Sequence, residues 1–552
     1  MISLPRFTAC LAVAAGLSST VNAIGKVTRT GRYLYNADGS RFYVKGVAYQ
    51  PQGVTDANNP FQEPTDFIDP LADAAGCSRD LPFLQQLGVN AVRVYSVNSS
   101  LNHDSCMQAF SGAGIYTIID LSLPVNGSID RSSAAWTTAL QDQYTASIDA
   151  FSKYDNVLAY NVGNEVVISP DGTGALAFVK AAARDTKAYL KSKSSSALVG
   201  YAAVDGDDWI VPVANYLSCD PSNGNSDSTA IDLYGLNNYE LCGNQTFQQA
   251  YATKTALFAG YNVAAYFSEF GCNNPSPRVW ADVPALFSDA AVPVWSGGVA
   301  FSYFPAQSGQ GQFGMVTISS DNTTVQTSQD FDNLKAQYTS VSLINNPPAG
   351  NSATAYPSCP TQNATFLAST TLPPTPVDSA CACVESSLSC QFTPQVSNTT
   401  AIVGTLLDTA CQLLGQQGSN CNSIAGNGTT GTYGAVAACD PSVKLSFVMS
   451  QFYELNNRNP ESCSFAGNGT VNANAPASVT AASAAASSCL SSATGVSTPS
   501  PASGSSSSSG SGSSTSKTPN AASRVLSEDG TGLMGVALML VISVASGIWS
   551  LI

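Results

Sequence analysis

The chain has 552 residues and a formal net charge of −15, with 22 Lys and Arg residues against 37 Asp and Glu residues. This length is too great for one ordinary domain, and the acidic balance argues against a nucleic-acid-binding surface. The chain has one histidine, His103, so a histidine-rich metal site is excluded and a Ser-His-Asp triad has only one possible base. We expect His103 to be structural.

Both ends of the chain have the composition of targeting segments. Residues 1–23 combine Arg6, an apolar run at 7–17 and a small-residue cleavage pattern at 21–23, which predicts a secretory signal peptide. The last residues, 533–552, are apolar and uncharged, and a polar spacer at 523–532 precedes them.

Small residues at 520–522 stand before that spacer, and this order predicts a GPI-anchor signal at 521–552 with attachment at Asn520. A plain C-terminal transmembrane helix is the alternative, although no basic cluster follows the apolar run. The Ser- and Gly-rich residues 490–520 are expected to form a flexible stalk.

The cysteines divide the chain into two parts. Fourteen remain once Cys10 leaves with the signal peptide, an even number that fits disulfides in a secreted protein. Six are spread over the first part: Cys77, Cys106, Cys219, Cys242, Cys272 and Cys359. The other eight crowd together: Cys381, Cys383, Cys390, Cys411, Cys421, Cys439, Cys463 and Cys489. They predict a cysteine-rich module at 378–489, joined by a linker at 346–377 to a large domain at 24–345.

Glycosylation sequons agree with an extracellular glycoprotein. They lie at Asn98, Asn126, Asn244, Asn322, Asn363, Asn398, Asn427 and Asn468.

Apolar and aromatic runs alternate with helical stretches through the large domain, after an N-terminal hairpin at 33–44. Helices are expected at 134–151 and 175–191, among others. The predicted strands are 42–48, 91–97, 115–121, 157–162, 198–203, 231–236, 263–267 and 298–304. Eight such strands predict an α/β fold, the (β/α)₈ TIM barrel, whose site is built at the C-terminal strand ends. A doubly wound sheet is the alternative, but it would want a glycine-rich phosphate loop after its first strand, and none is present.

Glutamates stand at the ends of the predicted strands. A single Glu at a strand end most often caps the next helix, but Glu is scarce in this domain. Of Glu63, Glu165, Glu240 and Glu269, the last three come at or just past a strand end, and Asn164 precedes the first of them. This placement favours paired acid/base chemistry.

The motifs of the large domain resemble those of the fungal β-1,3-glucanosyltransferases of glycoside hydrolase family 72, which are GPI-anchored. The matching stretches span residues 24 to about 345 in order. They are RFYVKGVAYQP (41–51), DPLAD (69–73), RD (79–80), NAVRVY (90–95), NHDSC (102–106), GNEV (163–166), YGLNNYELCG (234–243), SEFGC (268–272) and SGG (296–298). The crowded cysteines resemble the cysteine-box carbohydrate-binding module of one branch of that family. Only residues 302–308 are less acidic than the family pattern.

The resemblance implies that Glu165 is the acid/base and Glu269 the nucleophile of a retaining enzyme. It also implies sugar subsites lined by Gln50, Tyr95, Asp120, Asn164, Tyr239 and Tyr303. For sugar stacking we favour Tyr239 and Tyr303 over Tyr49 and Tyr95, although a buried tyrosine is the commoner role for any one of them. No metal or organic cofactor is expected.

The implied activity is internal cleavage of β-1,3-glucan and transfer of the new reducing end to the non-reducing end of another cell-wall glucan. The expected location is the extracellular face of the plasma membrane, where a GPI anchor holds a monomer in the outer leaflet. A plain endo-β-1,3-glucanase with the same residues is one alternative. A non-catalytic wall-glucan-binding protein is another, against which the presence of both glutamates argues.

With this resemblance in hand, we also predict three disulfides in the large domain. They pair Cys77 with Cys106, Cys242 with Cys272 and Cys219 with Cys359. The other eight cysteines are expected to pair inside the module.

Overall fold

The computed structural model describes residues 24–52, 67–124, 129–131, 133–206, 208–308, 311–350, 353–396 and 399–491. The predicted signal peptide and anchor signal with Asn520 lie outside these residues, as do the stalk from residue 492 onward and the sequons at Asn126 and Asn398. In the part of the chain that is described, we find no helix with the length and apolar character needed to cross a membrane.

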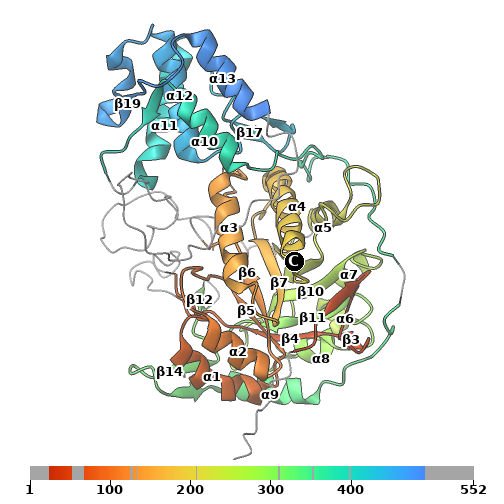
Figure 1. The fold of residues 1–552 in the computed structure, drawn as a ribbon. Coiled ribbons are helices and arrows are strands. Elements are labelled where there is room, and N and C mark those ends of the chain that lie inside the picture. The colour runs from red at the N-terminus through yellow and green to blue at the C-terminus, as the bar shows by residue number, and fades with distance from the viewer. Residues whose placement is uncertain are drawn as a thin grey trace, which may run out of the picture.

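Eight parallel strands close into a barrel in the order β10-β11-β4-β5-β6-β7-β8-β9, which confirms the predicted fold (Figure 1). Helices surround the barrel, so the strands are buried on both faces and read as nearly continuous apolar runs. The strands are β4 (Val44–Ala48), β5 (Ala91–Val94), β6 (Tyr116–Asp120), β7 (Val157–Asn164), β8 (Leu198–Val204), β9 (Leu233–Asn237), β10 (Ala264–Phe270) and β11 (Trp295–Ala300).

The helices of the barrel follow its strands in the chain. They are α1 (Ala74–Leu87), α2 (Asp104–Gly112), α3 (Thr138–Phe151), η1 (Pro170–Ala175), α4 (Leu176–Ser192), α5 (Ile210–Ser218), α6 (Phe247–Ala250), α7 (Ala252–Leu257), α8 (Asp282–Leu286) and α9 (Gln329–Ser340).

The eighth strand begins three residues earlier than predicted, at Trp295 instead of residue 298. Gly297 and Gly298 lie inside this strand and interrupt its apolar pattern. For that reason the sequence pattern predicts a strand start at residue 298. Gly297 has a φ of +84°, and a Cβ on it would lie 2.2 Å from the carbonyl oxygen of Val44 in β4. The close approach of the two strands therefore requires glycine. As a consequence, residues 301–304 lie beyond the strand end.

A small antiparallel sheet packs against the N-terminal end of the barrel. It contains β1 (Thr28–Thr30), β2 (Tyr33–Tyr35) and β3 (Arg41–Phe42), and so includes the predicted hairpin. Leu34 and Phe42 share one apolar cluster with the barrel residues Val44, Ile118 and Val299. Two further strand pairs follow the barrel: β12 (Gln307–Ser308) with β13 (Gly311–Gln312), and β14 (Val316–Ile318) with β15 (Val325–Thr327).

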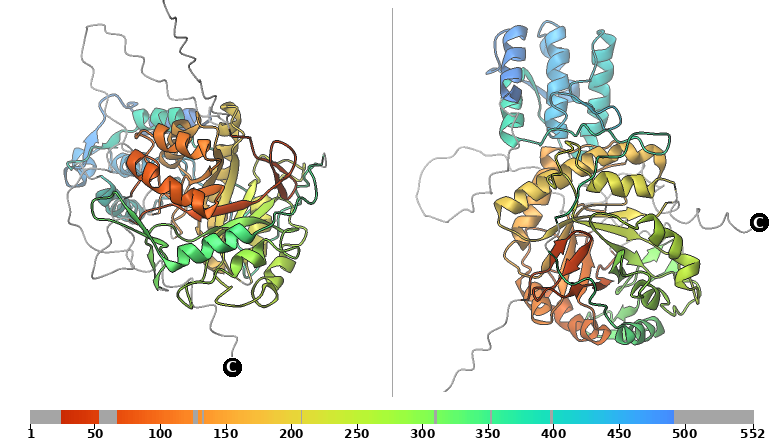
Figure 2. Two further views of the ribbon diagram at one scale, coloured as in Figure 1. Left: turned by 90° about the horizontal axis from the view of Figure 1, so that it is seen from below. Right: turned by 90° about the vertical axis from the view of Figure 1, so that its right-hand side faces the viewer.

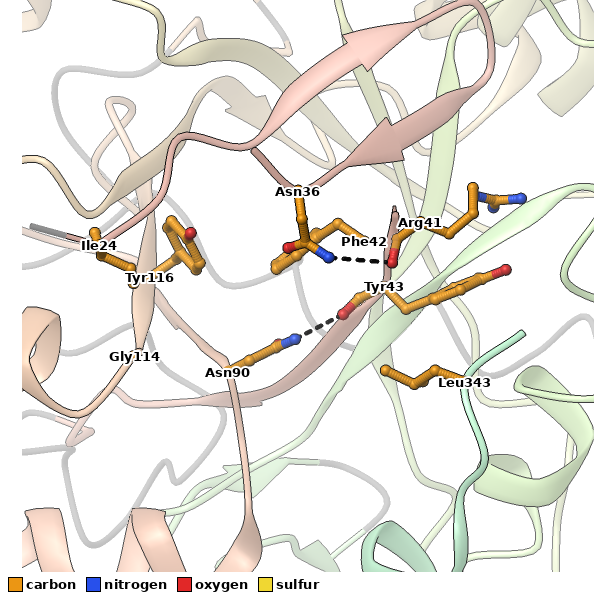
Figure 3. Close-up of a pocket in the computed structure, with 9 residues that line it drawn as sticks. All are labelled: Ile24, Asn36, Arg41, Phe42, Tyr43, Asn90, Gly114, Tyr116 and Leu343. Carbon is orange, nitrogen blue, oxygen red and sulfur yellow. Dashed lines mark hydrogen bonds between the residues drawn. The ribbon is translucent and has the colours of Figure 1, made fainter. Parts of the chain in front are cut away.

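A cavity of about 270 Å³ lies between the small sheet and the N-terminal ends of the barrel strands (Figure 3). Its polar side chains already have partners, since Asn36 donates to the carbonyl of Arg41 and Asn90 to that of Tyr43. The residues that line it are Ile24, Asn36, Arg41, Phe42, Tyr43, Asn90, Gly114, Tyr116 and Leu343. This cavity is at the end of the barrel opposite to the predicted catalytic glutamates.

The module is mainly helical, as predicted, and has its own apolar core. Its elements are α10 (Asp378–Ser387), β16 (Cys390–Phe392), α11 (Thr400–Gln416), β17 (Gly426–Asn427), β18 (Thr432–Tyr433), α12 (Pro441–Leu455), η2 (Pro460–Cys463), η3 (Phe465–Gly467), β19 (Gly469–Val471) and α13 (Val479–Ser491).

The seven disulfides among the described residues agree with the predicted division. Cys77–Cys106 and Cys242–Cys272 lie in the barrel, and Cys219–Cys359 ties the linker to it. The module contains Cys381–Cys439, Cys383–Cys489, Cys390–Cys463 and Cys411–Cys421.

The module packs on the barrel over α3 and α4, which both ribbon views show (Figures 1 and 2). The Asp440 carboxylate accepts hydrogen bonds from the Thr138 hydroxyl and the Ala139 amide, both 2.7 Å long. These bonds cap the N-terminus of α3, which therefore begins at Thr138 and not at the predicted residue 134. The rings of Phe178 and Tyr433 also meet across the junction, 5.7 Å apart.

The linker follows the barrel surface. Phe366 is fully buried against Tyr216, and Arg184 donates to the carbonyl of Pro373.

Candidate active site

Polar side chains converge at the C-terminal ends of the barrel strands. Glu269 lies in β10 and Glu165 directly follows β7, while Arg93 comes from β5 and Asn237 ends β9. Because all eight strands are parallel, their C-terminal ends meet at one rim. Residues more than 170 positions apart in the chain thereby become neighbours.

Glu269 is surrounded by hydrogen-bond donors. Its Oε1 accepts from Arg93 Nη1 at 3.1 Å and from the Tyr95 hydroxyl at 2.8 Å, and its Oε2 accepts from the Tyr239 hydroxyl at 2.8 Å. Only 9 % of the residue is exposed. Burial raises the pKa of Glu269 to about 7; Arg93 opposes that rise, the charge of Glu165 adds to it, and the two tyrosine hydrogen bonds oppose it.

Arg93 connects the polar residues at the base of the site. Its guanidinium is completely buried and forms an ion pair with Asp120, whose Oδ2 lies 2.7 Å from Nη2. The same Nη2 donates to Asn164 Oδ1 at 2.9 Å. Burial of a charge at this depth is tolerable because every donor direction meets an acceptor. Arg93 is the one charged residue of an otherwise apolar strand, a signal that the sequence did contain.

Asp120 lies beneath the site. Only 2 % of it is exposed, and its two oxygens are bonded to Arg93 and to Asn161 Nδ2. The prediction that Asp120 lines a sugar subsite is therefore wrong. Its carboxylate neutralises Arg93 instead.

Glu165 is fixed through its backbone. It has a φ of +47°, in the left-handed region, its amide donates to the Ala202 carbonyl at 2.8 Å, and its own carbonyl accepts two bonds from Arg131. Its side chain is half-buried and accepts one hydrogen bond among the residues described, from Asn237 Nδ2 at 2.8 Å. This backbone conformation is uncommon for a residue other than glycine, and the surrounding bonds are what maintain it.

Asn237 sits between the two carboxylates. Its Oδ1 accepts from the Ser268 hydroxyl at 2.7 Å and from Arg93 at 3.4 Å, so its Nδ2 is turned toward Glu165 and Asn164. Asn164 Oδ1 accepts from both Arg93 and Asn237. Those two bonds leave Asn164 Nδ2 as a donor to which the described residues present no acceptor.

Comparison with known proteins identifies the family to which this chain belongs. Residues 15–342 match the family model of glycoside hydrolase family 72, described as glucanosyltransferase, and residues 388–470 match the X8 domain. The chain belongs to glycoside hydrolase family 72.

Several named proteins are similar to it over most of their length. The 1,3-beta-glucanosyltransferase gas1 of Schizosaccharomyces pombe is 39% identical over 466 residues, which are 84% of this chain and 81% of that protein. The gas2 protein of the same yeast is 35% identical over 483 residues, 86% of this chain and 100% of that one. A solved structure of a glutamate-to-glutamine variant of Saccharomyces cerevisiae Gas2p, in complex with laminaritetraose and laminaripentaose, superimposes with a TM-score of 0.73. It is 31% identical and covers 84% of this chain and 99% of that chain.

For a family 72 enzyme, the aromatic residues at the rim are of special interest. Tyr95 and Tyr239 are half-buried at the rim, and each is bonded to Glu269. Tyr303 is not at the rim. It is completely buried, its hydroxyl donates to Asp80 Oδ1 at 3.2 Å, and its ring packs on Tyr49 and Phe304. Tyr303 and Tyr49 are thus core residues, and the expectation that Tyr303 stacks on sugar is wrong.

Phe301 occupies the place that was assigned to Tyr303. It is half-buried, and its ring meets those of Tyr95 and Tyr239 edge-on, with centroids 6.3 and 6.4 Å apart. Placing the eighth strand three residues too late hid this residue. With the correct strand end, the first aromatic after β11 is Phe301.

Gln50, which was predicted to line a sugar subsite, is half-buried and bonded to backbone groups of the rim. Its Oε1 accepts from the amides of Tyr95 and Ser96, both at 3.1 Å, and its Nε2 donates to the carbonyls of Ile68 and Pro51. Its amide is fully used in positioning the backbone of Tyr95.

His103 has the structural role that was predicted, since it is buried against Phe151 and bonded to Asp69 Oδ2 at 2.8 Å. No cluster of metal-ligating side chains occurs among the residues described.

Proposed function

We propose that this enzyme is a retaining β-1,3-glucanosyltransferase that cleaves glucan internally and elongates a second chain, with Glu269 as nucleophile and Glu165 as acid/base. The observation that carries the proposal is the unequal set of donors on two neighbouring carboxyl groups. Arg93, Tyr95 and Tyr239 point at Glu269, whereas Asn237 is the bonded donor at Glu165. The names of the relatives support the same reaction class.

The donor sets distinguish the roles of the two carboxyl groups. The three donors at Glu269 favour its ionised form against the burial that raises its pKa to about 7. A proton on Glu165 also removes that residue's contribution to the raised pKa of Glu269. The contacts around Glu269 are those expected of a nucleophile, which leaves Glu165 for the acid/base role that retention needs.

In the first half of the reaction, the Glu269 carboxylate attacks the anomeric carbon while Glu165 gives its proton to the departing glycosidic oxygen. The glycosyl group is then held as an ester on Glu269. Asn164 Nδ2 is available to donate to the sugar 2-hydroxyl, a bond that strengthens as positive charge develops on the ring. In the second half, Glu165 takes a proton from an acceptor hydroxyl, which attacks the ester and frees Glu269.

For transfer, the acceptor sugar must react with the glycosyl-enzyme in preference to water. Water is present at about 55 M and an acceptor at ~1 mM, so the enzyme must favour the sugar by about 6 kcal/mol. We assign part of this preference to the aromatic surface made by Tyr239 and Phe301. A pyranose stacked there would orient its hydroxyl and exclude water from the ester.

The remaining parts of the proposal concern location. The predicted signal peptide, anchor signal and sequons, together with seven disulfides, support a glycoprotein at the outer face of the plasma membrane. The X8 domain is proposed to bind wall glucan next to the barrel, and the enzyme is proposed to act as a monomer without a cofactor.

Product sizing tests the transferase directly. The enzyme is incubated with a reduced laminari-oligosaccharide, and the products are separated by length. We expect millimolar oligosaccharide to yield chains longer than the starting material, with hydrolysis taking over as the acceptor is diluted. Products that never exceed the input length at any concentration would leave a plain endo-β-1,3-glucanase.

Two variants test the roles of the carboxyl groups. Glu269→Gln should be secreted and folded but almost inactive, because an amide cannot attack the anomeric carbon. Glu165→Gln should fail on glucan yet still form the glycosyl-enzyme from donors whose leaving group needs no proton. Ordinary turnover of glucan by Glu269→Gln would refute the assignment.

A further inference from the structure

A buried arginine lies behind the aromatic surface. Arg278, between β10 and α8, is only 2 % exposed. Its Nη1 donates to the Phe301 carbonyl at 2.5 Å and its Nη2 to the Phe313 carbonyl at 2.7 Å. Nη1 also lies 3.4 Å from the carbonyl of Gly271, two residues after Glu269. One guanidinium thus joins three loops at the rim.

The guanidinium itself is held firmly. Asp330 in α9 accepts from the Arg278 amide at 2.7 Å and from Nε at 2.6 Å, and Asn333 Nδ2 donates to the Arg278 carbonyl. The guanidinium also stacks over Trp280, 4.1 Å from the ring centroid. Its position is therefore set by α9 and by the core, independently of any substrate.

The loops that Arg278 joins carry the rings around the nucleophile. Phe313 is buried and packs on both Phe301 and Tyr239, with centroids 5.6 and 5.7 Å apart. Phe301 in turn meets Tyr239 and Tyr95. A shift in the backbone of residue 301 or 313 would therefore move the surface that we assign to the acceptor.

The geometry points to Arg278 as a positioning residue that sets the choice between sugar and water in the second half of the reaction. This inference rests on the proposed transferase function. Arg278 touches none of the reacting groups, and it acts by fixing Phe301 and Phe313. Its planar fork reaches acceptors in divergent directions at once, which the single ammonium of a lysine does not reproduce.

The test is Arg278→Lys, with Arg184→Lys as its matched control. Arg184 also pairs its guanidinium with an aspartate, Asp185, and donates to a backbone carbonyl, that of Pro373, but it lies at the linker. We expect Arg278→Lys to need about ten-fold more acceptor for half-maximal transfer, because small misplacements of an oriented reactant are costly. Formation of the glycosyl-enzyme from an activated donor should change by less than about three-fold. Arg184→Lys should keep both values.

Thermal unfolding is measured on Arg278→Lys and Arg184→Lys. A fall in stability can then be separated from a change in the ratio of transfer to hydrolysis. If Arg278→Lys is not secreted, Asp330→Asn provides a milder change, since it keeps the shape and weakens the hold on the guanidinium. It should shift the acceptor requirement in the same direction.

A proportional loss of donor cleavage and transfer would show that Arg278 merely supports the fold, and the inference would fall. It would also fall if wild type elongates the oligosaccharide and Arg278→Lys, or Asp330→Asn in its place, keeps the wild-type acceptor requirement; the proposed function would then stand. Failure of the wild-type enzyme to elongate would instead overturn the proposed function.

Discussion

The hydroxyl of Tyr239 sets part of the charge balance at the nucleophile. Its bond to Glu269 favours the carboxylate and lowers the pKa of that residue against the effect of burial. Glu269 must be ionised to attack, so kcat/KM should fall as the pH drops through its pKa in the free enzyme.

Tyr239→Phe should therefore move the acid limb of the kcat/KM profile to higher pH, by about one unit for the loss of one bond to a charged group. Tyr303→Phe is the matched control, because its hydroxyl is bonded to Asp80 in the core. An acid limb that stays in place in Tyr239→Phe, or moves equally in both variants, would show that this bond does not govern the ionisation of Glu269.

At the level of single residues, the sequence was informative where a reactive residue type is scarce. Glu165 and Glu269 could be found because glutamates are few and stand at strand ends. The roles of Asp120 and Gln50 could not, because a polar residue at a strand end can face either a ligand or a neighbouring strand. Which of the two it faces depends on Arg93 and on the Tyr95 amide, and those contacts form only when distant strands meet.

The segment after β11 is the element that gives the site its aromatic surface. Phe301→Leu should raise the ratio of hydrolysis to transfer several-fold, while glycosyl-enzyme formation changes less, because a branched aliphatic chain offers no flat face to a pyranose. Tyr303→Phe should leave that ratio unchanged. The ratio is read from the product lengths at fixed acceptor concentration. An unchanged ratio in Phe301→Leu would show that this residue does not bind the acceptor sugar.

Element boundaries explain the main error at this scale. The alternation of strands and helices predicted the barrel, because a parallel sheet covered by helices has a strong apolar pattern. The eighth strand was misplaced because Gly297 and Gly298 look like a break, whereas they lie inside the strand where β4 approaches closely. Because the predicted strand start was three residues too late, Tyr303 was expected at the rim in the place that Phe301 occupies.

For the molecule as a whole, the junction between barrel and module contains an acidic cluster. Burial raises the pKa of Asp142 in α3 to about 7, and the nearby charges of Asp378 and Asp440 raise it further. Burial also raises the pKa of Asp378 and of Glu385, and it lowers the pKa of Lys444 to about 8. The folded chain therefore keeps a proton on Asp142 that the unfolded chain releases from about pH 4 upward.

Because the folded state binds more protons in that range, the stability that Asp142 contributes is full below about pH 4 and declines as the pH rises toward 7. Asp142→Asn should unfold at a higher temperature than wild type at pH 8 and at the same temperature at pH 4. Asp149→Asn, on the same helix, is the control, because Asp149 is paired with Lys193 and its loss should give no gain at pH 8. Calorimetry at pH 4, 6 and 8 measures the effect. A lower unfolding temperature for Asp142→Asn at pH 8 would contradict the account.

The division of labour between Glu165 and Glu269 is the central claim, and trapping the intermediate tests it most directly. Glu165→Gln is mixed with an oligosaccharide donor that has a good leaving group, quenched and analysed by intact and peptide mass spectrometry. We expect one added glycosyl group on the peptide that contains Glu269, and none in Glu269→Gln. An adduct on any other residue, or an adduct that survives in Glu269→Gln, would contradict it.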